Sequence, residues 1–168
     1  WLLAPASGNF VQREPEFGAP ATERTEFRIL YDARTLYIGV WAYDSDPSGI
    51  TASELKRDSN LGKGDQVKIA IDTFHDHRNA FSFFTNPLGA YKDAQSVENA
   101  RIINYDWNAV WETKTSVDGQ GWYAEMAIPL SQLRFPTAIA DATWGLNVCR
   151  VIIRKNEETY WVPFPREW

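Results

Sequence analysis

Aspartates concentrate in the loop-rich parts of the sequence, where their carboxylates are suited to bind a cation. Asp44 and Asp46 open a polar stretch over residues 44–64, while Asp72 and Asp76 flank the turn that follows an apolar alternating run. Ca²⁺ takes about six to eight oxygen ligands, many of them carboxylates. We therefore predict these four aspartates, with Asp65 beside them, at one end of the fold, as ligands of a structural calcium ion. The spacing is not that of an EF-hand, so the alternative is that they cap backbone amides in turns.

Histidines and glutamates offer weaker chemistry. His75 and His77 lie two residues apart, which in a strand would place both on one face, but no third ligand converges on them and a solvated turn is favoured. Glu112 and Glu125 are the carboxylates that a glycoside hydrolase would need as a pair. Both alternate with other residues in predicted strands, where surface pairing with Lys114 explains them better. No Gly-x-Ser-x-Gly, His-Glu-x-x-His or phosphate-binding motif occurs, so we predict that the protein is not an enzyme.

Tryptophans are the other residues with binding potential. Trp107 lies in a loop among Asn and Asp residues, a setting that favours an exposed aromatic platform, with Asn108 beside it. Trp111 alternates with threonines and is predicted on a sheet face. Cys149 is the single cysteine, so no intrachain disulfide can form, and its apolar neighbours favour a buried thiol.

The elements that must position these residues are predicted to be strands. The chain is 44% hydrophobic and 14% aromatic, with one Met, a composition that favours pleated surfaces over packed helices. Nowhere does a helical apolar period persist for ten residues. Period-two alternation instead predicts strands over residues 26–31, 36–43, 66–72, 80–86, 90–96, 110–117, 122–128 and 143–153, with a further strand near residues 10–12.

These short strands, joined by turns, predict an all-β, antiparallel β-sandwich of one domain covering residues 1–168, with residues 1–24 as an extended arm or loop. Residues 130–135 are too short for a full helix and predict a single turn. Trp122, Met126, Ile128 and Trp144 are predicted to lie in the core. The net charge is −5 with acids and bases interspersed, which excludes nucleic acid as a partner.

One segment resembles a known family. Residues 121–154 read GWYAEMAIPLSQLRFPTAIADATWGLNVCRVIIR, and the order Gly-Trp-x-x-Glu-x-x-Ile-Pro, Leu-x-Phe, Trp-Gly-x-Asn-x-x-Arg resembles carbohydrate-binding family 9, which is related to the DOMON domains. The resemblance extends over nearly the whole chain, through FRILYDARTLYIGVWAYDSDP and DQVKIAIDTFHD. The string GAPATER at residues 18–24 resembles the branch that forms the N-terminal module of large bacterial outer-membrane proteins. Trp1 resembles the end of that family's opening motif, which implies a truncated first strand.

The resemblance implies a jelly-roll-like sandwich with a sugar site. In sugar-binding members a ring lies between two Trp faces while polar side chains bind its hydroxyls. The first platform corresponds to residues 61–64, which are Leu-Gly-Lys-Gly, and two hydroxyl-binding positions correspond to Lys68 and a residue near Phe84. The region of Trp161 and Trp168 resembles the second platform, and Trp161 is the better candidate. Asn147 and Arg150 are expected to supply hydrogen bonds.

The predicted function is a non-catalytic carbohydrate-binding module of a cell-envelope protein, periplasmic or associated with the outer membrane. Its expected partner is an oligo- or polysaccharide, and family members also carry structural calcium. One alternative is a structural or interaction domain that docks on its own downstream membrane barrel. A less favoured alternative is haem binding through Met126 with His75 or His77, as related sandwiches do.

Overall fold

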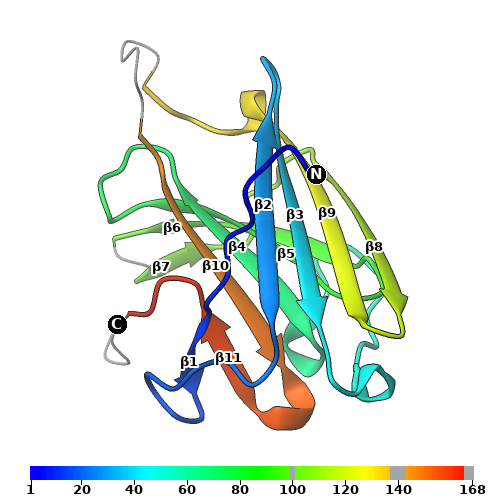
Figure 1. Cartoon of the computed structure of the whole chain (residues 1–168). Helices are drawn as coiled ribbons and strands as arrows, with labels where there is room; N and C mark the ends of the chain where they lie inside the picture. The colour runs from blue at the N-terminus through cyan, green and yellow to red at the C-terminus, as the bar shows by residue number, and fades with distance from the viewer. Residues whose placement is uncertain (99–100, 137–142, 165–168) are drawn as a thin grey trace.

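Two antiparallel sheets packed face to face make up the part of the chain described by the computed structural model, residues 1–98, 101–136 and 143–164 (Figure 1). Within these ranges eleven strands and four short 3₁₀ turns form the regular structure. None of the helical segments described is long and apolar enough to cross a membrane. The all-β antiparallel sandwich predicted from the sequence is confirmed.

The smaller sheet has four strands, and its order places the strands predicted over residues 26–31 and 36–43 beside the family-like segment. Strands two and three pair directly, with Ile29 opposite Ile38, and the third strand then pairs along its length with the ninth. The strands, in spatial order, are β2 (Thr25–Tyr31), β3 (Thr35–Tyr43), β9 (Gly121–Pro129) and β8 (Glu112–Asp118).

The larger sheet has seven strands drawn from both ends of the chain. In spatial order they are β1 (Val11–Glu14), β11 (Glu157–Tyr160), β10 (Gly145–Ile152), β4 (Gln66–Asp72), β5 (Ala80–Thr85), β6 (Tyr91–Val97) and β7 (Ile102–Asn104). β7 and β11 were not predicted, because a run of three or four residues is too short for its alternation to be recognised.

The core lies between the sheets and follows the predicted alternation. Val67, Ile69 and Ile71 of β4 and Trp122, Met126 and Ile128 of β9 all point inward, and each is at most 1% exposed. Because a strand turns successive side chains to opposite faces, the residues between them point outward. The predicted burial of Trp122, Met126 and Ile128 is confirmed, while Trp144 is half-buried against Phe135.

The N-terminal arm joins the two sheets. Ser7 forms a bridge to Phe27 of β2, and Val11 in β1 then pairs with Tyr160 of β11 in the other sheet. The strand predicted near residues 10–12 is therefore present as β1. The single turn predicted after β9 is confirmed as the 3₁₀ turn Leu130–Gln132, whereas the polar stretch after β3 has its turns at Pro47–Gly49 and Leu61–Lys63.

Candidate functional site

A groove of about 610 Å³ lies on the outward face of the seven-stranded sheet. Its floor consists of small residues on neighbouring strands: Asn147 of β10 lies opposite Ala70 of β4, which lies opposite Ser82 of β5. The next outward positions are also small, Gly145 on β10 and Ala80 on β5. Small side chains at adjacent outward positions leave the backbone of the sheet recessed. The groove is thus a consequence of residue size in register across three strands.

Larger side chains border this floor. Tyr160, Cys149, Lys68 and Phe84 form one row across four adjacent strands, since each lies opposite the next in the sheet register. Phe164 packs its ring 4.6 Å from that of Tyr160 and extends the same border. Elsewhere the groove is lined by the turn between β4 and β5, which contributes His77, Arg78 and Asn79.

Glu158 organises the polar groups of this border. Its Oε1 accepts hydrogen bonds from Lys68 Nζ at 2.9 Å and from the Tyr160 hydroxyl at 2.6 Å, and it lies 3.6 Å from Cys149 Sγ. Burial alone would raise the carboxyl pKa of Glu158, but these donors lower it below the usual value. The side chain is therefore a charged acceptor at neutral pH that holds Lys68 and Tyr160 in place.

Cys149 is buried beneath the groove, as predicted, and its thiol has low nucleophilic reactivity. Burial raises its pKa to about 12. Because the thiolate is the nucleophilic form, a thiol with this pKa is almost wholly unreactive at neutral pH. Cys149 acts as a packing residue in the row that borders the floor.

Asn147 is the one predicted sugar-binding residue that lines the groove. Its Nδ2 donates to the backbone carbonyl of Val162 at 2.8 Å, and its Oδ1 accepts from the amide of Val162 at 3.0 Å. Asn147 therefore holds the segment after β11, which carries Phe164, against the sheet. The second amide proton of Asn147 Nδ2 has no protein acceptor among the described contacts of this side chain.

Trp107 and Asn108 lie away from the groove. The Trp107 ring is half-buried against the core, 5.0 Å from the ring of Phe81 and 6.0 Å from that of Phe83. Asn108 Oδ1 accepts a hydrogen bond from Arg57 at 3.1 Å. The expected exposed platform is not formed, because the loop after β7 folds its tryptophan back onto β5.

Trp161 and Arg150 point to the interior because of strand parity. Trp161 follows Tyr160 in sequence, so it turns to the opposite side and packs 5.0 Å from the ring of Phe27. Arg150 follows Cys149 and is 1% exposed. Its guanidinium donates to the carbonyl of Tyr43 at 2.7 Å and lies 3.4 Å from Asp44. Neither residue reaches the groove, and Trp168 lies outside the described residues.

The four predicted calcium ligands divide between the two ends of the sandwich, which corrects the expectation that they share one end. Asp72 pairs with Gly145 at the start of β10, whereas Asp44 contacts Arg150 and Arg154 at the far end of that strand. Asp72 and Asp76 accept backbone amides of their own turn, including those of His77 and Arg78. Asp72 and Asp76 therefore cap backbone amides in a turn, which was the alternative to calcium binding in the sequence analysis.

Asp44 belongs to a buried ion cluster at the other end of the sandwich. Arg154 binds both carboxylate oxygens of Asp44, at 2.6 and 2.9 Å, and Arg154 and Lys155 both pair with Glu23. The Asp46 carboxylate is not part of this cluster, and the Asp46 backbone amide donates a hydrogen bond to Asp44 Oδ1. Over residues 1–98, 101–136 and 143–164 no group of three or more His, Cys, Asp or Glu side chains is placed to hold a metal ion. The guanidinium of Arg154 binds both carboxylate oxygens of Asp44, where a metal ion would otherwise bind. Asp44, Asp46, Asp72 and Asp76 therefore do not fit a calcium site.

Two residues of the groove were named in the sequence analysis only through the family resemblance. Lys68 and Phe84, at positions matched to the family's hydroxyl-binding residues, both line the groove, while Leu61 is 1% exposed and belongs to the interior. Tyr160, Phe164 and the turn His77 to Asn79 were missed. The alternation of Glu157–Tyr160 would have placed Tyr160 outward had that short strand been recognised.

Comparison with solved structures gives the same fold as the residue patterns. No protein-family model matches the chain, and no curated protein matches it. A candidate carbohydrate-binding protein from Bacteroides uniformis superimposes with a TM-score of 0.77 at 14% identity, covering 99% of this chain and 81% of the other. A family 9 carbohydrate-binding module from Caldicellulosiruptor kristjanssonii, solved with cellotriose and with glucose, gives a TM-score of 0.62 at 16% identity. The match to the cellotriose complex covers 95% of this chain and 73% of the module.

Identities of 14% and 16% establish the architecture, and they agree with the residue patterns of the family-like segment. In this chain the architecture consists of two antiparallel sheets, with the GWYAEMAIP strand in the four-stranded one. In its fold, this chain is a β-sandwich domain of the carbohydrate-binding family 9 type.

Proposed function

We propose that this domain is a non-catalytic carbohydrate-binding module and that its sugar lies in the groove on the outward face of the seven-stranded sheet. The observation that carries the proposal is the composition of that groove. A recessed floor of Ala70, Ser82 and Ala80 is bordered by the rings of Phe84 and Tyr160. Sugars bind to such surfaces because their C–H faces pack on aromatic rings while charged and amide groups bind their hydroxyls.

The size and polar groups of the groove support the same ligand class. A volume of about 610 Å³ is within the range of small-molecule sites, roughly 300–1,000 Å³. Lys68, Asn147 and Asn79 bring hydrogen-bonding groups to its border. A shallow site of this kind orders few contacts, so we expect micromolar to millimolar dissociation constants, about 4 to 8 kcal/mol of binding free energy.

The arrangement of carboxylates supports binding without catalysis. Glycoside hydrolysis uses two carboxyl groups that face the sugar from opposite sides. Asp72 lines the groove, but its Oδ1 accepts the amide of Phe74 and its Oδ2 that of His77. Glu112 and Glu125 belong to the four-stranded sheet, on β8 and β9. The carboxylates near the groove therefore serve to hold the fold.

Isothermal titration of the purified domain with glucose, cellobiose, xylobiose and a set of soluble glycans tests the proposal. Tryptophan fluorescence is a poor readout because no tryptophan of the described residues lines the groove. Amide NMR shifts locate the site: we expect them at Ala70, Ser82 and Asn147 and not on β8. Absence of binding at tens of millimolar for every glycan would overturn the proposal.

A second candidate is an interaction domain that uses the same face to dock on another part of its own protein or on a partner. It is favoured by residues 61–64, where the family's first aromatic platform is replaced by Leu-Gly-Lys-Gly and Leu61 is buried. Absence of sugar binding combined with a well-folded domain would support this candidate.

We further propose that the domain functions in the bacterial cell envelope, in the periplasm or at the outer membrane. The support is the resemblance of residues 18–24, GAPATER, to the outer-membrane branch of the family. Fractionation of cells that produce the native protein tests this location, and recovery in the cytoplasm would contradict it.

A further inference from the structure

The two cations that line the groove differ in their ion pairing. The whole chain has a net charge of −5, and Lys68 and Arg78 line the groove together with the Asp72 carboxylate. Lys68 is paired with Glu158 at 2.9 Å, and Asp72 accepts two backbone amides. Arg78 is therefore the lining cation that has no close ion pair among the described residues.

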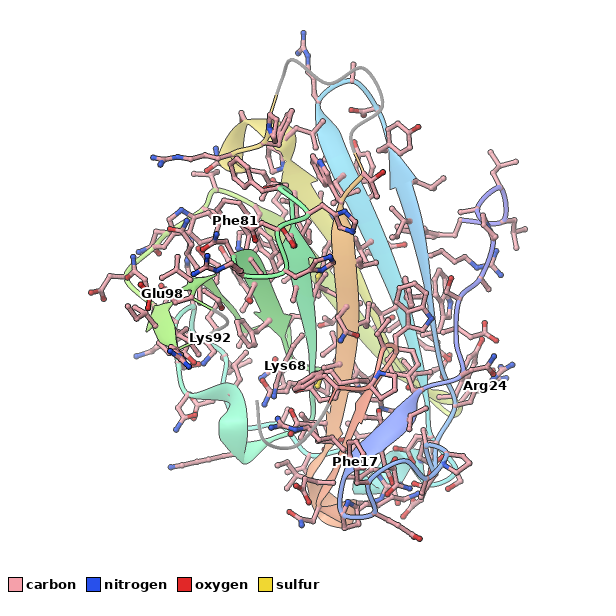
Figure 2. The ribbon with its side chains drawn as sticks, turned by 90° about the vertical axis from the view of Figure 1, so that its left-hand side faces the viewer. Phe17, Arg24, Lys68, Phe81, Lys92 and Glu98 are labelled. Atoms are coloured by element: carbon pink, nitrogen blue, oxygen red, sulfur yellow. The ribbon has the colours of Figure 1, made fainter. Side chains whose placement is uncertain are left out.

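Lys92 lies next to the groove, in a smaller hollow that it lines together with Asp58 and Asp93. It lies on β6 directly opposite Phe84, which lies opposite Lys68 on β4, so the register places the three residues in one row of the sheet. Figure 2 labels Lys68 and Lys92, the two ends of this row. The ammonium of Lys92 lies 5.0 Å from the centre of the Phe84 ring and 4.7 Å from that of Tyr105. Lys92 is thus positioned at the end of the row by two aromatic faces rather than by a carboxylate.

The charges of Lys68 and Lys92 are balanced very differently. Lys68 pairs with Glu158 at 2.9 Å, and negative groups beside it raise its pKa despite its burial. Over the part of the chain that the structure describes, no carboxylate lies within ion-pair distance of Lys92. Burial and the positive charge of Lys68 lower the pKa of Lys92, although the more distant Asp58 opposes this effect. An anion arriving at Lys92 would therefore supply the direct ion pair that this lysine lacks among the described residues.

Arg78, in the turn between β4 and β5, places a further positive charge at the groove. Its backbone amide caps Asp76, but the Asp76 carboxylate also accepts the amide and side chain of Asn79. No carboxylate of the described chain forms a close ion pair with the Arg78 guanidinium. A guanidinium in this state can bind a carboxylate through two N–H groups.

We infer that the sugar bound by this groove is acidic, with a uronic acid carboxylate that pairs with Lys92 while the ring lies along the small-residue floor beside Phe84. The inference rests on the proposed function and names the substrate class of the same groove. Charge-assisted hydrogen bonds to a carboxylate are about twice as strong as neutral ones, and Lys92 is partly shielded from water. Uncharged sugars of the same size lack this interaction.

Isothermal titration with matched acidic and neutral ligands tests the inference on the intact domain. We compare oligogalacturonates with galacto-oligosaccharides, and glucuronate-containing disaccharides with cellobiose. At low salt we expect about tenfold tighter binding of the acidic member of each pair. Raising the salt concentration to 0.5 M should remove most of this preference, because screening acts on the partly exposed charges. Sulfated neutral sugars form a further arm, and a preference for them over uronates would contradict a carboxylate ligand.

Lys92→Gln supplies the residue-specific test, with Lys114→Gln on β8 of the opposite sheet as the matched control. We expect Lys92→Gln to lower the acidic-to-neutral affinity ratio about tenfold and Lys114→Gln to leave it unchanged. Equal binding of acidic and neutral sugars, with no effect of Lys92→Gln on the ratio, would overturn the inference and leave the proposed function intact. Failure of every sugar to bind would overturn both.

Discussion

The two outward faces of the sandwich start from similar backbones and end as different surfaces. On the seven-stranded sheet, Ala70 and Ser82 lie side by side and leave a groove of about 610 Å³. On the four-stranded sheet the smallest outward residue, Gly39, is covered. A Cβ built on Gly39 would lie 3.0 Å from ring atoms of both Trp1 and Trp41, so these indoles fill the space that the glycine leaves.

The comparison shows that a small residue makes a hollow only when its neighbours do not fill the space. Trp1 packs edge-on against Trp41 at 5.8 Å, and its Nε1 donates to Glu125. Arg28 lies over the Trp41 ring as well, at 5.7 Å. The four-stranded face keeps a smaller hollow of about 290 Å³ beside Trp41 and Tyr123. The aromatic-rich face is thus a packed surface, while the face with fewer rings retains the groove.

Filling the groove should produce the largest change. Ser82→Trp places an indole on the floor, and we expect a loss of at least about 100-fold in sugar affinity, roughly 2.7 kcal/mol, because the ring occupies the ligand's space. The side chain points outward, so the fold should be retained. Isothermal titration and thermal unfolding measure the two effects. Ser116→Trp, on the exposed surface of β8, is the matched control and should bind sugar normally.

Removing the packed aromatic surface should affect stability instead. Trp41→Ala deletes a half-buried ring that contacts Trp1, and we expect a loss of about 2 kcal/mol in the free energy of unfolding. Sugar affinity should not change, because Trp41 lies on the other sheet. Urea denaturation and titration check both parts. A variant with normal stability and weakened binding would place the site on the four-stranded face.

Truncating one ring at the border of the groove should have a moderate effect on binding. Phe84→Ala removes an aromatic face beside the floor, and we expect about a tenfold loss of affinity, roughly 1.4 kcal/mol. Phe84→Tyr keeps the ring and serves as the conservative comparison. If both variants bind as the native domain does, Phe84 has no part in the site.

The Lys68–Glu158 pair should make a smaller, pH-dependent contribution to stability. The pKa of Glu158 is lowered in the folded state, so its stabilisation is present above its unfolded value of about 4.5 and declines as the pH falls through the folded pKa. We expect Glu158→Gln to cost about 1 kcal/mol at pH 7 and less at pH 3. Urea titrations of both proteins at the two pH values measure this difference. An equal cost at both values would mean that the carboxylate charge is not involved.

Removal of metal ions by EDTA should have the smallest effect on the domain, because the predicted calcium ligands do not fit a calcium site. The Asp44 carboxylate is bound by Arg154 and contacts Arg150 at the end of the sandwich. We therefore expect EDTA to leave the melting temperature unchanged. Arg154→Met should lower the melting temperature, because it removes an ion-pair partner of the buried Asp44 carboxylate. A melting temperature that falls with EDTA and recovers with Ca²⁺ would assign calcium to these loops.

Sequence alternation was sufficient to locate most strands and the core. Val67, Ile69 and Ile71 alternate in a run long enough to identify β4, and Trp122 with Met126 identifies β9 in the same way. A period of two that persists for seven residues has few other physical explanations, since it places one face of the strand on a core. The single cysteine was likewise expected to be buried, and it is.

The groove residues were harder to predict because strand parity reverses with a shift of one residue. Trp161 was preferred to Trp168 as a sugar-binding residue, although its neighbour Tyr160 is the one that lines the groove. Arg150 was chosen from β10, where Cys149 and Asn147 hold the outward positions. Both residues come from segments beside the groove, but their side chains turn away from it, since chemical type alone does not report which side of a sheet a residue occupies.

The sequence by itself determined the all-β architecture, the inward residues of the long strands and the absence of recognised catalytic motifs. Only the tertiary structure decided where the groove lies. Ala70 and Ser82 come from the consecutive strands β4 and β5, while Asn147 and Tyr160 come from β10 and β11, far along the chain. They form one groove because the register of the sheet aligns their outward positions. That register depends on hydrogen bonds between strands, and local composition does not encode it.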